Sequence, residues 1–263
     1  MKQTGVSVVL GSFNRKRLLN LTIDSIRAEL ASTPFPSEII VVDGGSTDGS
    51  LNWLIKQKDI ITVVQHNRGT WHGKQIVRRS WGYFMNLGFK CAQGKYICML
   101  SDDCLVVPGA INNGYRLFED ELTKGSPIGA VAFYWRNWPK QKKYWVGLAF
   151  GNRMFVNHGM YLKEAMEKVG YVDEASYFFY HADGDLCLRM SEFGYRCIDS
   201  PTSFIEHYAH APGRSTERQQ QDFEEYVNRW KFLGNPEQDW IEKDHIDPFR
   251  TATLFKKVRW LFS

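Results

Sequence analysis

The sequence lacks the long apolar runs that mark membrane-spanning helices. No segment approaches the roughly 20 consecutive apolar residues that a membrane span needs. The first apolar run, at 6–10, comes almost at the start of the chain and is too short to be the core of a secretory leader. We therefore expect a cytoplasmic protein without a membrane-spanning helix.

Cysteine is scarce and irregularly placed. The chain has five cysteines, an odd number, and none of them shows the pair spacing of a metal site. They are Cys91, Cys98, Cys104, Cys187 and Cys197. We expect free, mostly buried thiols, because this pattern does not suit a disulfide framework.

The body of the chain also lacks an excess of charge of one sign. The net charge is +4, and residues 249–263 carry four cations and no acid, so the preceding 248 residues have no net charge. This balance argues against a nucleic-acid partner. With 43% hydrophobic residues among 263, the chain can bury the core of one large domain.

Short apolar runs alternate with helical patterns in the first half of the chain. The runs lie at 6–10, 39–42, 61–64 and 96–100, and apolar residues within 19–30 recur at helical spacing. This order predicts an α/β fold with a mainly parallel sheet flanked by helices. Such sheets commonly bind nucleotides.

Acidic residues and a histidine follow the predicted strands. Asp102 and Asp103 come one residue after the run at 96–100, a second acidic cluster lies at 183–185, and His207 follows a later extended stretch. Open α/β sheets bind ligands at the carboxyl ends of their strands. Carboxylate oxygens and an imidazole gathered there suit a divalent metal and a phosphorylated substrate.

Several stretches, in this order and spacing, resemble family 2 glycosyltransferases of the GT-A fold. They lie at 6–15, 41–50, 86–96, 169–174 and 183–189. The resemblance implies an inverting enzyme that uses a divalent metal, Mn²⁺ or Mg²⁺. It also implies a nucleotide-sugar donor, with UDP as the expected nucleotide, and a glycan or lipid-linked glycan acceptor whose hydroxyl receives the sugar.

The resemblance also divides the chain. We expect one GT-A domain at 1–235, with a nucleotide-sugar-binding half at 1–107 and an acceptor-side half at 108–235. Residues 236–263 would form a basic, amphipathic helical tail. The apolar stripe within 249–263 fits two readings, docking on the protein's own core or peripheral contact with an anionic membrane surface.

Three positions match the metal-binding part of the family's pattern. Asp103 matches the metal-binding acid, and His207 matches a histidine that completes the metal site, with His210 as a competing candidate. Asp102 stands in the middle of the usual Asp-x-Asp, where Ser101 replaces the first acid. We expect Asp102 to take over the donor contacts of that acid, and the alternative is that it only caps a turn.

Asp183 matches the general base, which removes the proton of the acceptor hydroxyl. The family usually has an acid before it, but here the residue is Ala182. The alternative is that Asp183 is the N-cap of a helix beginning near Gly184. Asp185 is expected to be structural and to pair with Arg189, one helical turn onward.

Four further positions are expected to bind the donor. Ser12 and Asp43 match positions that contact the nucleobase, and Asn14 and Asn86 fall within the same motifs. A carboxylate at position 43 could accept the imino N–H of uracil or a similar base.

The diphosphate contacts depart from the family's pattern. Met85 replaces the arginine that commonly precedes Asn86. Lys74, Arg78 and Arg79 lie in a segment longer than the family norm, so they either supply a replacement cation or form a solvated basic face.

Two other functions remain as alternatives. The absence of an acid at Ala182 would suit a catalytically silent carbohydrate-binding relative, although Asp103 and Asp183 favour an enzyme. A sugar nucleotidyltransferase would need a glycine-rich, basic loop after the first strand, and residues 11–14 do not supply one.

Overall fold

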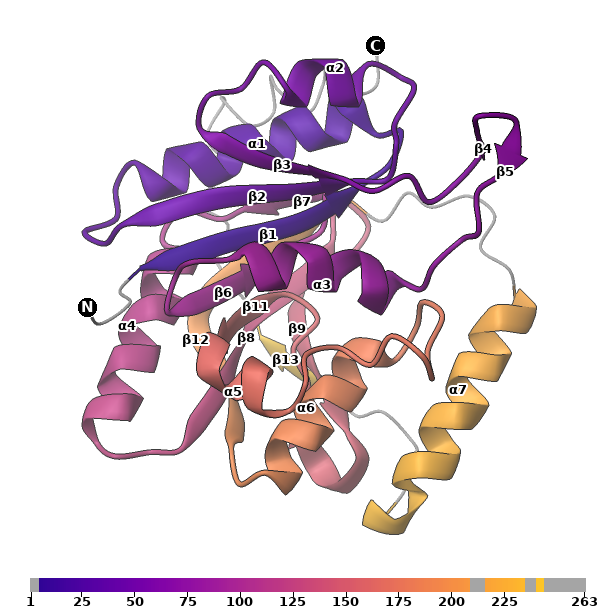
Figure 1. Cartoon of the computed structure of the whole chain (residues 1–263). Coiled ribbons are helices and arrows are strands. Elements are labelled where there is room, and N and C mark those ends of the chain that lie inside the picture. Colours follow the sequence, from indigo (N-terminus) through magenta and orange to yellow (C-terminus); the bar gives the residue numbers. More distant parts are fainter. Residues whose placement is uncertain (1–4, 209–215, 235–239, 244–263) are drawn as a thin grey trace.

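The computed structural model describes residues 5–208, 216–234 and 240–243 (Figure 1). The strands are β1 (Val6–Ser12), β2 (Ser37–Asp43), β3 (Ile60–Val64), β4 (Thr70–Trp71), β5 (Lys74–Gln75), β6 (Tyr96–Met99), β7 (Cys104–Val106), β8 (Ile128–Asn137), β9 (Tyr144–Ala149), β10 (Arg153–Met154), β11 (Gly159–Leu162), β12 (Arg196–His207) and β13 (Trp240–Lys243). The α-helices are α1 (Lys16–Leu30), α2 (Ser50–Leu54), α3 (Trp81–Cys91), α4 (Ala110–Thr123), α5 (Lys163–Lys168), α6 (Ala182–Glu192) and α7 (Thr216–Trp230), and two short 3₁₀ turns are η1 (Phe150–Asn152) and η2 (Lys231–Leu233).

The first half of the chain builds a parallel sheet in the order β6-β1-β2-β3. β1 pairs in parallel with both β2 and β6, and β2 pairs in parallel with β3. The four predicted strands are therefore confirmed. Parallel pairing brings the carboxyl ends of β1, β2 and β6 to one edge of the sheet, where ligands bind in open α/β folds.

The second half extends the same sheet with mainly antiparallel strands. β11 lies between β6 and β8 and is antiparallel to both. β12 pairs in parallel with β8 and antiparallel with β7. The α/β fold is confirmed, but parallel geometry dominates only in the first half, because β8 to β10 are joined by connections short enough to reverse the chain.

Helices cover both faces of the parallel part of the sheet, with α1 on one face and α3 on the other (Figure 1). Leu19 and Ile23 of α1 are fully buried, as their helical spacing predicts. A Cβ on Gly88 of α3 would lie 2.6 Å from Val9 Cγ1 and 2.9 Å from Val42 Cγ2. Glycine at this position lets α3 pack directly on β1 and β2.

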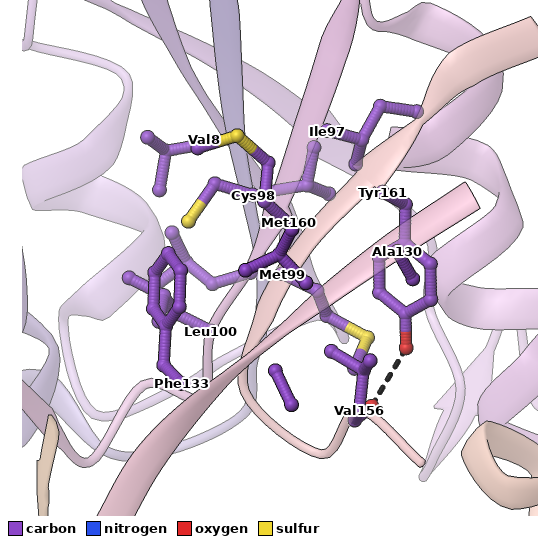
Figure 2. Close-up of a cluster of buried hydrophobic side chains, with 14 of the residues drawn as sticks. Val8, Ile97, Cys98, Met99, Leu100, Ala130, Phe133, Val156, Met160 and Tyr161 are labelled. Atoms are coloured by element: carbon purple, nitrogen blue, oxygen red, sulfur yellow. Dashed lines mark hydrogen bonds between the residues drawn. The ribbon is translucent and has the colours of Figure 1, made fainter. Parts of the chain in front are cut away.

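The central core lies around β6, where the two halves of the sheet meet. Figure 2 shows Val8 of β1, Cys98 of β6 and Met160 of β11 in one apolar cluster. The hydroxyl of Tyr161 donates to the carbonyl of Val156 at 2.6 Å, which satisfies a polar group inside this cluster. All five cysteines are free, and Cys98, Cys104 and Cys187 are buried, so the expectation of free and mostly buried thiols is confirmed.

Some predictions concern segments that the structure does not describe. His210 and residues 249–263 lie outside the described residues. Of the segment 236–263, the structure describes 240–243, which form β13 and pair antiparallel with β9. Within the described ranges, no helix is both long enough and apolar enough to span a membrane.

Candidate active site

The predicted donor residues lie at the carboxyl edge of the parallel strands. Ser12 ends β1, Asp43 ends β2, and Asp102 lies in the turn that follows β6. The hydroxyl of Ser12 donates to Oδ2 of Asp102 at 2.8 Å, and both residues are buried. This contact joins two residues 90 positions apart in the sequence.

Asp43 has one carboxylate oxygen that the protein uses and one that it leaves available. Oδ1 accepts hydrogen bonds from the backbone N–H groups of Gly45 (2.9 Å) and Ser46 (2.7 Å). Oδ2 is buried and has no hydrogen-bond partner among the described residues. A buried acceptor without a partner is costly, so Oδ2 is suited to accept an N–H of a ligand.

Asn14 and Asn86 are held by the protein itself. The amide oxygen of Asn14 accepts from the backbone N–H of Thr47 at 2.7 Å and ties together the loops after β1 and β2. Asn86 is buried in α3, where its amide group donates to the Val172 carbonyl (2.9 Å) and to Glu174 (2.7 Å), while its oxygen accepts from the Val172 N–H (3.2 Å). Both asparagines therefore hold loops of the fold, and their contact with the donor stays a prediction.

Arg15, which the motif analysis did not single out, contacts both acids of the pair. Its Nη1 lies 3.0 Å from Oδ1 of Asp102 and 2.6 Å from Oδ2 of Asp103. The side chain of Asp102 therefore binds Arg15 and Ser12 and does not serve as a turn cap. The position of Arg15 just after the first strand was the available signal, but its contact with a turn 87 residues away depends on the tertiary structure.

The two acids have opposite pKa shifts. Burial and the neighbouring charge of Asp103 raise the pKa of Asp102 to about 6, although Arg15 and Ser12 oppose this shift. Burial also disfavours the charged form of Asp103, but His207 and Arg15 outweigh it and lower the pKa of that carboxyl. Asp103 is therefore the stronger acid of the pair.

His207 lies beside Asp103 because β12 pairs with β7, which directly follows the acids. Its Nδ1 is 3.0 Å from Oδ1 of Asn137, which is opposite it on β8. An amide oxygen can only accept, so Nδ1 donates to Asn137 and Nε2 is the ring nitrogen on the side of Asp103. Nε2 faces Oδ1 of Asp103 at 3.3 Å.

This arrangement fits a divalent metal. Oδ1 of Asp103 is buried and makes no hydrogen bond among the described residues, and it lies 3.3 Å from Nε2 of His207. A hard cation bound by both atoms would satisfy both, and an oxygen acceptor that fixes the far N–H of the histidine is common around metal ligands. Across the described ranges, no group of three histidine, cysteine or acidic side chains gathers as a metal site. A metal held here would therefore need ligands beyond the described side chains.

Asp183 lies in the first turn of α6 and contacts Asn157, whose neighbour His158 has its ring 5.3 Å from that of His207. The helix begins at Ala182 after His181, so Asp183 is not its N-cap and that alternative is wrong. Oδ2 of Asp183 accepts from the side-chain amide of Asn157 at 2.8 Å, and Oδ1 lies 2.9 Å from the Gly184 N–H. Asn157 holds the carboxylate in place, and no sequence motif pointed to it.

Asp185 is structural, as expected. It is fully buried and pairs with Arg189 at 2.7 Å. It also accepts from the hydroxyl of Tyr177 (3.2 Å) and the indole N–H of Trp230 (3.0 Å). These contacts join α6 to α7 and to the segment that precedes α6.

Aromatic side chains connect the two parts of the site. Trp135 of β8 lies opposite Trp145 of β9, with ring centroids 4.1 Å apart. The Trp135 ring makes edge contacts with His207 at 5.4 Å and with His158 at 5.7 Å. His158 follows Asn157 in the chain, and its ring lies 5.3 Å from that of His207, so Trp135 lies beside both the candidate metal ligand and the segment that holds Asp183.

Comparison with protein families identifies the chain. The family described as glycosyl transferase family 2 matches residues 7–167, more than half of the sequence. The chain belongs to this family. This glycosyltransferase is 27% identical over 111 residues to chondroitin synthase of Pasteurella multocida, an alignment that covers 41% of this chain and 10% of that protein. It is 30% identical over 116 residues to an uncharacterized glycosyltransferase of Nostoc sp., covering 43% of this chain and 33% of the relative.

Solved structures share the fold of this glycosyltransferase. A mannosyltransferase from Pyrobaculum calidifontis in complex with GDP-Man and Mn²⁺ has a TM-score of 0.61 at 17% identity, over 88% of this chain and 65% of that one. TarS 1–349 from S. aureus in complex with UDP-GlcNAc has a TM-score of 0.56 at 14% identity, over 86% and 67% of the two chains. These likenesses confirm the GT-A fold.

Proposed function

We propose that this glycosyltransferase is metal-dependent and inverting. It moves a sugar from a nucleoside diphosphate, with UDP as the expected nucleotide, to a hydroxyl of a glycan or lipid-linked glycan. The observation that carries the proposal is the buried Oδ1 of Asp103, which makes no hydrogen bond among the described residues and lies 3.3 Å from Nε2 of His207 at the carboxyl edge of the sheet. The binding of GDP-Man with Mn²⁺ and of UDP-GlcNAc by proteins of the same fold supports it.

The donor would lie across the ends of β1, β2 and β6. Oδ2 of Asp43 would accept an N–H of the base, Ser12 would also contact the base, and Asp102 would contact the ribose. Asp103 and His207 would hold the metal, which when bound offsets the negative charge that develops on the diphosphate leaving group.

The acceptor would approach from the α6 side of the site. Asp183 would take the proton of the attacking hydroxyl, while Asn157 keeps its carboxylate oriented. Attack from the face opposite the diphosphate inverts the anomeric configuration. The paired rings of Trp135 and Trp145 offer an apolar surface for a sugar between the metal ligands and the base.

Calorimetric titration of UDP and GDP, each with and without Mn²⁺, tests the proposal. The wild type should bind one nucleotide tightly only with Mn²⁺, and Asp103→Asn should lose this metal-dependent gain. Asp24→Asn is the matched control, because Asp24 lies on α1 with its side chain about half exposed. Metal-independent binding, or unchanged binding by Asp103→Asn, would refute the metal site, and retention of configuration in the product would refute the inverting mechanism.

A further inference from the structure

A loop beyond the family's usual length carries arginines to the ligand-binding edge of the sheet. Residues 67–79 include the β4–β5 hairpin, which lies on the same side of the molecule as the beginnings of α3 and α7 (Figure 1). The side chain of Asn67 closes the base of this loop: its oxygen accepts from the Arg79 N–H at 2.6 Å and its amide donates to the Arg79 carbonyl at 3.3 Å. Closure at this point brings Arg68 and Arg78 together, although they are ten positions apart.

Two of these arginines lie over aromatic rings next to the candidate site. The guanidinium of Arg68 is 4.8 Å from the ring of Phe13, which lies between Ser12 and Asn14. Arg78 is 5.0 Å from the ring of Phe178. Stacking on a ring holds the guanidinium plane while its N–H groups stay free to bind oxygen atoms.

A third arginine, from a distant helix, joins this group. Arg218 of α7 lies 3.7 Å from the centroid of the same Phe178 ring. The backbone of Phe178 is fixed, because its N–H donates to Asp222 of α7 at 2.7 Å and its carbonyl accepts from Trp81 of α3 at 2.8 Å. We call Arg68, Arg78 and Arg218 the guanidinium cluster. Two of its members, Arg78 and Arg218, therefore lie over a ring whose backbone is held on both sides.

The cluster places the positive charge of Arg78 near those of Arg68 and Arg218. Within the described ranges, no carboxylate forms an ion pair with Arg68 or Arg78. Burial and the positive charges of Arg68 and Arg218 lower the pKa of Arg78. Asp222, the nearby acid of α7, is buried and accepts from the backbone N–H groups of 178–180. Arginines that only face solvent would be expected to lie apart, because their positive charges repel each other. A bound anion would offset this repulsion.

We propose that the guanidinium cluster is an anion site that binds a phosphate group of a substrate. The inference rests on the proposed function for the identity of the substrates, and two of them could supply the phosphate: the donor diphosphate or a phosphate-bearing acceptor. The position of Arg68 over Phe13 places the cluster beside the donor loops, and Arg218 places it beside the acceptor side. It would compensate for the missing arginine at Met85.

The test is phosphate binding by the full chain without metal. Calorimetric titration with inorganic pyrophosphate in the presence of EDTA should show binding by the wild type, and Arg68→Gln and Arg78→Gln should each weaken it about tenfold, the scale of one charge-assisted hydrogen bond. Arg116→Gln is the matched control, because Arg116 is exposed on α4, away from the loop. Binding by the control should equal that of the wild type.

Two further titrations identify the source of the phosphate. If the donor supplies it, the variants lose affinity for UDP but not for uridine. If the acceptor supplies it, glycerol 3-phosphate still binds the wild type when UDP and Mn²⁺ are saturating, and the variants weaken that binding instead. No binding of pyrophosphate by the wild type, or equal binding by all variants, would overturn the site. The Mn²⁺-dependent binding lost in Asp103→Asn is measured separately, so failure of this site is distinguishable from failure of the proposed function.

Discussion

Asn137 should control the affinity of the site for a metal although it is not itself a ligand. Its Oδ1 lies 3.0 Å from Nδ1 of His207, and the parallel register of β8 and β12 places the two residues opposite each other. Asn137→Ala removes the acceptor, so the imidazole can exchange its tautomer and rotate away from Asp103. Losing such a partner typically weakens metal binding by about 10- to 100-fold, which is about 1.4 to 2.7 kcal/mol.

Titration of free Mn²⁺ by electron paramagnetic resonance, with saturating UDP, measures this effect directly. Asn137→Asp keeps an acceptor for Nδ1 and should restore most of the affinity. Asn52→Ala is the control for loss of an asparagine, because Asn52 is exposed on α2. Thermal unfolding of each variant without metal shows whether the fold is intact.

If Asn137→Ala binds Mn²⁺ as tightly as the wild type while Asp103→Asn does not, the proposed role of Asn137 is wrong. In that case the orientation of His207 would not depend on Asn137. An equal loss in Asn137→Asp and Asn137→Ala would also contradict the tautomer argument, because only the second change removes the acceptor.

Three further predictions concern the base and the structural acids. Asp183→Asn should lower turnover at least ~100-fold and leave donor affinity unchanged, since it removes only the general base; steady-state kinetics with near wild-type turnover would exclude that role. Asp185→Asn should lower the free energy of unfolding by about 3 to 5 kcal/mol, because it leaves the charge of Arg189 uncompensated in a buried site; urea denaturation measures this, and a loss below about 1 kcal/mol would contradict it. Burial opposes ionisation of Asp173, but hydrogen bonds from Ser176 and others lower its pKa to about 2. Its stabilisation is therefore present above about pH 4 and is lost as the pH falls toward 2, so Asp173→Asn should cost about 1 to 2 kcal/mol at neutral pH and flatten the acid limb of a stability profile.

The sequence by itself determined the frame of the donor site. Continuous apolar runs such as 39–42 predict buried strands, because a strand covered on both faces has no solvent side for polar residues. Asp43 follows one such run directly and Asp102 follows another after Ser101, so parallel pairing brings them to one edge. The motif order added the family, and the pairing of Asp185 with Arg189 followed from helical spacing.

The tertiary structure alone decided which partners orient these groups. Asn137 faces His207 only in one register of β8 and β12, and a slip of one residue would turn each side chain to the other face. The contacts of Arg15 with the acid pair and of Asn157 with Asp183 likewise join residues from separate elements. Local sequence patterns report burial and periodicity within one element, whereas these contacts depend on how separate elements pack, and that is decided by the whole core.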